Sequence, residues 1–385
     1  MRKFVGVAAV VGVSVAFAAF LVLRDGDRAW RVERERRQPD LLMADDTMVC
    51  GNDVWEVFCL DLATGDELFH IRGADLMEVL AVSDGTVLIG ESPVNASNGT
   101  VLRALGRDGR QQWQVTGSYD LSLRVPVIDG VAVVPADDLD RSLQGVDLAT
   151  GEQVWEAPYP GEVVDVLESP YLVGATVTDG ENVYRTMIRP GRAGDPRVEI
   201  VAIDPATGDA QWGMPVGDVV VPTTQVQGAA AVDGTDTTAL VVGTIAGGRR
   251  LVLLDRTTGE ISAEVRLGDR PADVATLDGT VIVLTDDELR GYSPDGDELW
   301  AQTVPVREMA ADRRAVLYSG DVVAVDDTLY LDTTRVWTVD PETGDRAHTV
   351  AGDGIGAFAA TSEIVVIADA CCPVRGYIEA RHVDG

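Results

Sequence analysis

The chain has 385 residues, and its 63 acidic against 31 basic side chains give a formal net charge of −32 at pH 7. A surface this negative repels phosphate backbones, which argues against nucleic acid as a partner. The simplest interpretation of the charge is solubility, and a basic ligand or partner is the alternative. The 40 glycines, the 46% hydrophobic share and the lack of amphipathic helical runs after residue 23 predict an all-β fold with tight turns.

The first element in chain order is an uncharged apolar stretch at residues 4–23. A helix of about 20 apolar residues crosses the hydrocarbon core of a membrane. The stretch therefore predicts a transmembrane signal anchor that follows a short cytoplasmic N-terminus, residues 1–3. Residues 16–18 (Ala-Phe-Ala) match a cleavage site, which leaves a cleaved signal peptide as the alternative.

The orientation of this predicted anchor follows from its flanks. Arg2 and Lys3 resemble the basic start of a signal sequence, and long domains are translocated largely regardless of the basic residues that follow the helix. The adjacent Cys371 and Cys372 suit an oxidising compartment. We therefore expect a single-pass protein of the cell membrane with residues 24–385 on the extracytoplasmic side.

One turn motif recurs along residues 24–385. An apolar pair is followed by Asp, two further residues, Thr-Gly and an aromatic residue four positions after the Gly, as in LDLATGDELF (60–69) and VDLATGEQVW (146–155). With the weaker copies, the motif glycines are Gly65, Gly109, Gly151, Gly208, Gly259, Gly296 and Gly344. A period of about 40–50 residues is that of a four-stranded propeller blade.

A second pattern, two apolar strands joined by a tight acidic or glycine turn, recurs eight times, for example as VSDGTVLI (82–89). Eight hairpins against seven turn motifs predict an eight-bladed β-propeller with one motif split between the chain ends. Residues 24–30 (RDGDRAW) repeat the motif spacing, so we expect residues 27–33 to pair with residues 377–383 and close the ring. A seven-bladed ring with a loose N-terminal linker is the alternative.

The aromatic residue of the motif is large enough to fill the wedge between neighbouring blades. The residues in this position are Trp30, Phe69, Trp113, Trp155, Trp212 and Trp300. Ala263 and His348 take the position in the remaining copies, so we expect weaker contacts between blades there.

The strand–Asp-x-x-Thr-Gly-x-x-x-Trp repeat resembles the quinoprotein-type (PQQ-like) β-propeller repeat, and the resemblance covers essentially everything after residue 24. It implies the propeller fold. It implies less about function, because in that family the repeat builds quinone-cofactor dehydrogenases and also non-enzymatic scaffolds, including the eight-bladed lipoprotein of outer-membrane protein assembly.

The sequence shows no catalytic motif. The three histidines, His70, His348 and His382, belong to no H-E-x-x-H pattern, and no G-x-S-x-G or Walker motif occurs. The vicinal Cys371-Cys372 resembles the vicinal disulfide of some quinone-cofactor dehydrogenases. The chain shows neither a recognisable basic cradle nor the calcium site that this anionic cofactor needs. We therefore expect no catalytic residue, no cofactor and no metal site.

The cysteines suggest a bridge across the closure of the ring. Cys50 ends the second strand of the first blade, and Cys371 and Cys372 follow the second strand of the last blade. These blades are neighbours if the ring closes, so a disulfide from Cys50 to Cys371 or Cys372 would clamp the junction. The alternative is that Cys59 is simply buried in mid-strand and that all four cysteines stay reduced.

Binding usually resides on loops that a rigid scaffold holds. We expect the tight turns on one face of the ring and the longer loops on the other, where residues 179–199 account for the widest gap between motif glycines. Four arginines of this segment predict contact with an acidic group of a partner: Arg185, Arg189, Arg192 and Arg197. The alternative is a mobile loop without a role.

These features favour a binding or scaffold protein over an enzyme. We expect a membrane-anchored extracytoplasmic propeller that presents one face to a protein or cell-envelope partner. A quinone-cofactor (PQQ) dependent dehydrogenase is the alternative that the family resemblance offers. The sensor half of a signalling system is a third interpretation, although only three residues precede the predicted membrane helix.

Overall fold

A computed structural model of the chain describes residues 28–34, 41–53, 55–73, 76–92, 99–117, 119, 125–136, 142–157, 171–189, 197–215, 224–232, 234–244, 247–268, 272–285, 288–303, 325–326, 334–340, 342–352, 355–360, 364–369 and 376–382. All regular secondary structure in these parts is β-strand, which confirms the predicted all-β fold. The predicted membrane segment at 4–23 lies outside them. Within them, no helix has the length and apolar character needed to cross a membrane.

The described strands are numbered in chain order. The first sixteen are β1 (Arg28–Arg34), β2 (Leu41–Ala44), β3 (Met48–Asp53), β4 (Glu56–Asp61), β5 (Glu67–Arg72), β6 (Leu76–Ser83), β7 (Thr86–Ser92), β8 (Thr100–Gly106), β9 (Gln111–Gly117), β10 (Val127–Ile128), β11 (Val131–Pro135), β12 (Leu143–Asp147), β13 (Gln153–Ala157), β14 (Tyr171–Thr178), β15 (Val183–Arg189) and β16 (Arg197–Ile203). The rest are β17 (Ala210–Pro215), β18 (Thr224–Ala231), β19 (Thr237–Thr244), β20 (Gly247–Asp255), β21 (Ile261–Gly268), β22 (Ala272–Leu277), β23 (Thr280–Thr285), β24 (Glu288–Tyr292), β25 (Glu298–Thr303), β26 (Val325–Asp326), β27 (Thr334–Val339), β28 (Arg346–Gly352), β29 (Ile355–Ala360), β30 (Ile364–Asp369) and β31 (Gly376–His382).

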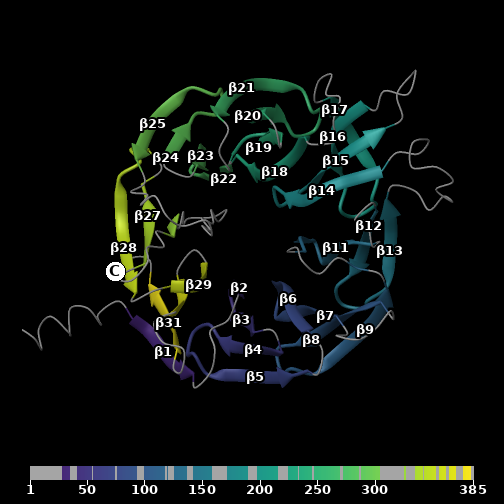
Figure 1. Ribbon diagram of the computed structural model, residues 1–385, viewed down its shortest axis with the longest axis vertical. Coiled ribbons are helices and arrows are strands. Elements are labelled where there is room, and N and C mark those ends of the chain that lie inside the picture. Colours follow the sequence, from purple (N-terminus) through teal and green to yellow (C-terminus); the bar gives the residue numbers. More distant parts are fainter. Residues whose placement is uncertain are drawn as a thin grey trace, which may run out of the picture.

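Among the described residues, these strands form seven four-stranded sheets and the three-stranded sheet β26–β28. Neighbouring strands within a sheet are antiparallel, as in β2–β3 and β14–β15. Figure 1 shows the sheets arranged around a ring in chain order, with β2, β6, β14, β18 and β22 toward the centre and β5, β9, β17, β21 and β25 along the rim. The chain is therefore a β-propeller.

The ring is closed by the N-terminal strand. β1 pairs antiparallel with β31, so that Trp30 lies opposite Ala380 and Arg34 lies opposite Gly376. The sheet order is β1-β31-β30-β29, which places β1 at the edge of a sheet otherwise built from the C-terminal part of the chain. The predicted pairing of residues 27–33 with residues 377–383 is confirmed.

Two kinds of turn lie on one face of the ring, which we call the turn face. Because antiparallel strands alternate in direction, the turn after the first strand of a sheet and the turn after the third strand emerge on the same side. Several of the inner turns pair an Asp with a Gly at positive φ, as at Asp84-Gly85 and Asp129-Gly130. Positive φ at both central residues is typical of a type I′ hairpin turn, whose twist matches that of the strands.

The outer turns on this face come in two lengths. In the long turns the Gly N–H donates to the carbonyl of the Asp four residues earlier, and these turns end at Gly65, Gly151, Gly208, Gly259 and Gly344. In the short turns the Gly N–H donates to the residue three earlier, and these turns end at Gly109 and Gly296. In the long turn at Asp61, the carboxylate Oδ1 accepts the Ala63 N–H at 3.0 Å and the Thr64 N–H at 2.9 Å.

Each of these turn glycines receives the wedge residue of the preceding sheet. A Cβ atom added to Gly208 would lie 2.6 Å from the Trp155 ring, so only glycine leaves room for the indole. The pairs, each with the wedge residue first, are Trp30 with Gly65, Phe69 with Gly109, Trp113 with Gly151, Trp155 with Gly208, Trp212 with Gly259, Ala263 with Gly296 and Trp300 with Gly344. The five long turns receive tryptophan, and the two short turns receive Phe69 or Ala263.

A hydrogen bond completes the contact at the long turns. The indole N–H reaches the carbonyl of the residue that follows the turn Asp: Trp30 donates to Leu62 at 2.6 Å, Trp113 to Leu148 at 2.6 Å, Trp155 to Pro205 at 2.7 Å and Trp212 to Arg256 at 2.8 Å. Hydrophobic core residues also pack at the junctions between neighbouring sheets. One cluster combines Met48 and Phe69 of the β2–β5 sheet with Met77 and Val79 of the β6–β9 sheet.

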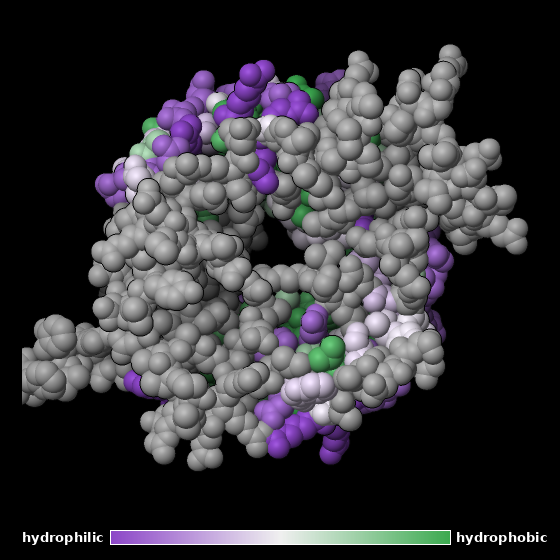
Figure 2. Space-filling view, in the orientation of Figure 1, coloured by the Kyte–Doolittle hydropathy of each residue, from purple (hydrophilic) through white to green (hydrophobic). Residues whose placement is uncertain are grey.

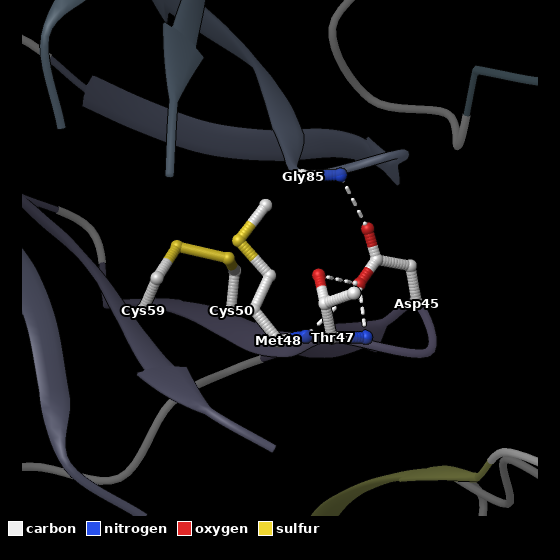
Figure 3. Close-up of a disulfide and its surroundings, with 6 residues drawn as sticks. All are labelled: Asp45, Thr47, Met48, Cys50, Cys59 and Gly85. Atoms are coloured by element: carbon white, nitrogen blue, oxygen red, sulfur yellow. Dashed lines mark hydrogen bonds between the residues drawn. A yellow bond between two sulfur atoms is a disulfide. The ribbon is translucent and has the colours of Figure 1, made fainter. Parts of the chain in front are cut away.

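The expected clamp between Cys50 and Cys371 or Cys372 is wrong. Cys50 is bonded to Cys59 instead (Figure 3). The two cysteines lie opposite each other on β3 and β4, with Cα atoms 4.1 Å apart, and both are buried. The bridge therefore ties two strands of one sheet. Cys371 and Cys372 lie outside the described residues.

Candidate functional site

A small pocket opens on the inner wall of the ring, and we call it the inner pocket. Its volume is about 230 Å³. Nine residues line it: Leu42, Met43, Ala44, Leu80, Ala81, Val82, Ser83, Val125 and Val127. They come from β2, from β6 and from residues 125 and 127, the second of which begins β10; these are the first strands of three successive sheets. Figure 2 shows the ring hollowed at its centre, with apolar residues of the described part visible below the opening.

The inner pocket exists because short side chains stand where these strands converge. Ala44, Ala81 and Ser83 leave space that larger residues would fill. Leu42 and Leu80 form the buried floor, each about 1% exposed. Ser83 is the only lining residue with a polar side chain. The pocket therefore favours an apolar group and offers no nucleophile–base pair and no metal ligand set.

Three carboxylates follow the lining strands on the turn face. Asp46 comes two residues after Ala44, Asp84 comes directly after Ser83, and Asp129 comes two residues after Val127. All three are exposed. Two residues of extended chain span at most about 7 Å, so each of these aspartates lies within about that distance of a lining residue. The site thus combines an apolar interior with a negative rim.

The rim is held in place by Asp45, as Figure 3 shows. One carboxylate oxygen accepts hydrogen bonds from the Thr47 backbone N–H and hydroxyl, both at 2.8 Å, and from the Met48 N–H at 2.9 Å. The other oxygen accepts the Gly85 N–H at 2.8 Å, which belongs to the next sheet. Asp45 therefore joins the β2–β3 turn to the β6–β7 turn, and two walls of the pocket are fixed relative to each other.

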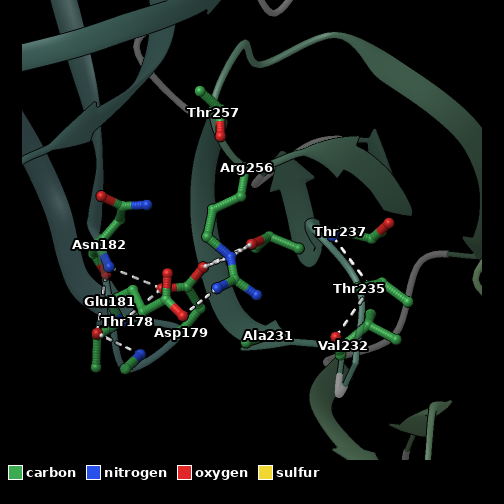
Figure 4. A network of polar contacts seen from close by, with 12 residues as sticks. Thr178, Asp179, Glu181, Asn182, Ala231, Val232, Thr235, Thr237, Arg256 and Thr257 are labelled. Atoms are coloured by element: carbon green, nitrogen blue, oxygen red, sulfur yellow. Dashed lines mark hydrogen bonds and ion pairs between the residues drawn. The ribbon is translucent and has the colours of Figure 1, made fainter.

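A second polar cluster joins the β14–β17 and β18–β21 sheets (Figure 4). Asp179 Oδ2 accepts hydrogen bonds from the Tyr184 hydroxyl at 2.7 Å and from the Thr238 hydroxyl at 2.5 Å, and it lies 3.4 Å from Arg256 Nε. Arg256 also pairs with Glu181. Asp179 Oδ1 caps its own turn, so each carboxylate oxygen has partners.

The electrostatics of this cluster indicate a structural role. Burial raises the pKa of Tyr184, and the charge of Asp179 adds to the rise. Burial alone would lower the pKa of Arg256, but the bond to Glu181 and the charges of Asp179 and Glu181 outweigh it and raise the pKa. The tyrosine therefore stays neutral and the arginine stays charged at neutral pH. These contacts therefore hold the two sheets together.

The structure describes only part of the arginine segment that the sequence predicted as a binding loop. Arg189 ends β15 and Arg197 begins β16, and the two residues lie opposite each other in this hairpin. Arg185 lies within β15 and is fully buried, so it cannot reach a partner from the surface. Arg192 lies outside the described residues. Arg185 therefore does not take the predicted role, and the partner contact predicted for the other three arginines stays a prediction.

His70 is the one histidine whose side chain is described. It lies 3.0 Å from Glu56, which also pairs with Arg72. These residues belong to β4 and β5 of one sheet, away from the inner pocket. In the described part of the chain, no three His, Cys, Asp or Glu side chains are grouped to hold a metal ion.

The family comparison agrees with the geometry. The repeat and the ring define a PQQ-like β-propeller. A family model described as outer membrane protein assembly factor BamB matches residues 15–188 and 196–371. The chain therefore belongs to this family.

Two solved structures share the fold. The first is BamB from Moraxella catarrhalis, at 16% identity and a TM-score of 0.58, with 91% of this chain and 98% of that chain covered. The second is the quinohemoprotein alcohol dehydrogenase from Comamonas testosteroni, at 14% identity and a TM-score of 0.57, with 93% and 76% covered.

One curated relative also matches in sequence. It is the serine/threonine-protein kinase AfsK from Streptomyces coelicolor, at 31% identity over 185 residues. The match covers 44% of this chain but only 20% of that protein, so the chain spans about a fifth of the length of this relative.

The quinone cofactor of the dehydrogenases does not fit the described site. The cofactor is an anionic tricarboxylate, so it needs cationic side chains around it. The inner pocket is lined by apolar side chains and one serine, and the residues at its rim are carboxylates. Like charges would repel such a ligand.

Proposed function

We propose that the protein is a binding or scaffold module whose rigid ring presents the inner pocket to a protein partner. The observation that carries this proposal is the inner pocket itself. It is apolar, it lies where three sheets meet, and it has no reactive group. The wedge tryptophans and Asp45 hold its walls, and a fixed concave apolar site suits binding.

We propose further that each described sheet is one blade of an eight-bladed ring, anchored by residues 4–23 with the propeller on the extracytoplasmic side. The Cys50–Cys59 disulfide supports this location, because structural disulfides persist in oxidising compartments. The sequence match to a fifth of a much longer kinase supports a module that serves as one part of larger systems. Membrane fractionation tests the anchor: a chain that an alkaline wash releases is not held by a membrane-spanning helix.

The test of the binding role is partner capture with a filled pocket. The full chain is cross-linked in the membranes of its host, and the bound proteins are identified. Ser83→Trp places an indole in the inner pocket, and Gln153→Trp places one on the exposed rim strand β13 as a matched control. We expect Ser83→Trp to lose a partner that the wild type and Gln153→Trp both retain. Equal recovery by all three proteins would place the binding site elsewhere.

The dehydrogenase alternative is tested separately. The full chain is mixed with the quinone cofactor and calcium, and the absorbance of the bound cofactor is recorded after gel filtration. We expect no cofactor to travel with the protein, because the rim of the inner pocket is negative. Stoichiometric retention of the cofactor would favour an enzyme.

A further inference from the structure

The inner pocket is too small for a typical cofactor and suits a side chain. Pockets for small molecules usually have volumes of about 300–1,000 Å³. The inner pocket has about 230 Å³, with apolar walls and a single hydroxyl. Its natural occupant is therefore one large apolar side chain, or two small ones, that projects from a partner.

The charge around the pocket determines which residues should flank that side chain in the partner. Asp46, Asp84 and Asp129 stand exposed in the turns that follow the three lining strands, and none of these turns contains Lys or Arg. Three arginines of the turn face have acidic partners: Arg107 pairs with Asp61, Arg110 with Asp108, and Arg256 with Asp179 and Glu181. Among the side chains that the structure describes, a ligand near these turns therefore meets negative charge that no arginine neutralises.

We propose that the inner pocket takes an apolar side chain from a protein segment whose flanking residues are Lys or Arg. This inference rests on the proposed binding function and specifies the chemistry of the partner. The apolar side chain supplies the burial, and the flanking cations lie against the carboxylates of Asp46, Asp84 and Asp129. Complementary charge at a rim chiefly speeds association and rejects wrong partners, so an acidic segment with the same apolar core is excluded.

The test uses three labelled peptides and the full chain, with fluorescence anisotropy at low salt. The first peptide has a Leu-Trp-Leu core flanked by arginines. The second has the same core flanked by aspartates, and the third has a Ser-Gly-Ser core flanked by arginines. We expect the first peptide alone to bind tightly, and we expect Ser83→Trp to abolish its binding.

Two sets of charge variants distinguish attraction to the three rim carboxylates from attraction to the overall negative charge of the protein. The triple variant Asp46→Asn, Asp84→Asn and Asp129→Asn should weaken binding of the first peptide about tenfold, since three exposed ion pairs are lost. The matched triple variant Asp278→Asn, Asp295→Asn and Asp297→Asn removes the same charge from the exposed turns of the β22–β25 sheet. It should change the affinity less than twofold. Asn at positions 84, 129 and 278 tolerates the positive φ found there.

Each other outcome has a distinct meaning. If the aspartate-flanked peptide binds equally well and Ser83→Trp still blocks it, the binding function stands and the preference for cations is overturned. If the Ser-Gly-Ser peptide binds as well as the first, or if both triple variants weaken binding alike, the attraction is general and the pocket proposal is overturned. If no peptide binds and Ser83→Trp retains every captured partner, the binding function at this pocket also falls.

Discussion

The long and short outer turns differ by one residue, and this difference decides how neighbouring sheets are joined. At the long turn of Gly151, the residue after the turn Asp, Leu148, presents a carbonyl that accepts the Trp113 indole N–H. At the short turn of Gly296, the wedge position holds Ala263, which has no donor. At all seven described junctions a long turn receives a tryptophan and a short turn receives a residue without an N–H donor in its side chain. A wedge residue is therefore selected by the turn that receives it.

The largest effect should follow removal of a wedge tryptophan. We expect Trp155→Ala to lower the free energy of unfolding by about 3–5 kcal/mol, because the change leaves a cavity at the junction and removes the bond to Pro205. Val154→Ala is the matched control, since Val154 precedes Trp155 on the same strand and is 48% exposed. It should cost less than about 0.5 kcal/mol. Chemical denaturation measures both, and equal losses would show that the wedge does not hold the junction.

A smaller effect should separate the wedge contact from backbone strain. Gly208 and Gly130 both have φ near +75° to +79°, but a Cβ atom at Gly208 would meet Trp155 at 2.6 Å, whereas one at Gly130 would meet nothing within 4 Å. Gly130→Ala should cost about 1–2 kcal/mol from the left-handed backbone alone. Gly208→Ala should cost about 1–3 kcal/mol more from overpacking. If thermal melts show equal losses for the two variants, the close approach has no energetic weight.

The comparison is sharpened by converting a short turn into a long one. Residues 293–296 are replaced with Asp-Leu-Ala-Thr-Gly, the sequence of residues 147–151, with and without Ala263→Trp. We expect each change alone to be neutral or destabilising. Together they should show a favourable coupling of about 1–2 kcal/mol in a double-mutant cycle, because the new carbonyl accepts the new indole N–H. Additive effects would mean that turn length and wedge residue are independent.

The smallest effect concerns acid. Hydrogen bonds from the Thr150 hydroxyl and backbone N–H lower the pKa of Asp147 in the long turn at Gly151. A lowered pKa stabilises the folded state above the unfolded value of about 3.9, and this stabilisation is lost as the pH falls through the folded pKa. Asp147→Ala should therefore cost up to about 1 kcal/mol at neutral pH, given the exposure of the group, and progressively less below about pH 4.

The short turn at Gly296 supplies the control for this pH dependence. There the Ser293 hydroxyl accepts the Asp295 N–H at 3.3 Å and the Asp297 N–H at 3.1 Å, and a hydroxyl does not titrate in acid. Ser293→Ala should therefore show the same loss at pH 3 and pH 7. A loss that depends on pH in the same way for both variants would assign the acid effect to the protein as a whole.

Much of the ring could be predicted from the sequence because its joints are local patterns. The turn glycines mark every described junction, an aromatic residue four positions after a motif glycine marks all of them except the one at Ala263, and the split motif at residues 24–30 predicts the closing strand. The correlation between turn length and wedge residue is also visible in the sequence.

The rest depends on contacts that no local pattern encodes. The arginines of the β15–β16 hairpin suggested a loop because charged residues are seldom buried, yet Arg185 lies in the middle of a strand. The sequence gives a weak indication of the Cys50–Cys59 bridge, because the two cysteines lie equally far from the turn between Asp53 and Glu56 and therefore face each other across the hairpin. No sequence pattern indicates the inner pocket, because its walls come from three different sheets.

The split sheet also determines the order in which the protein can be completed during synthesis. β1 is among the first strands to emerge, and Trp30 can dock on the β4–β5 turn once Gly65 has been made. Until β31 has been made, β1 therefore has no strand to pair with. β31 emerges after β30 and lies between β1 and β30, so its arrival pairs both edges at once. A ribosome that stalls before residue 376 therefore leaves a ring with two open edges, which quality-control proteases and chaperones can recognise as unfinished.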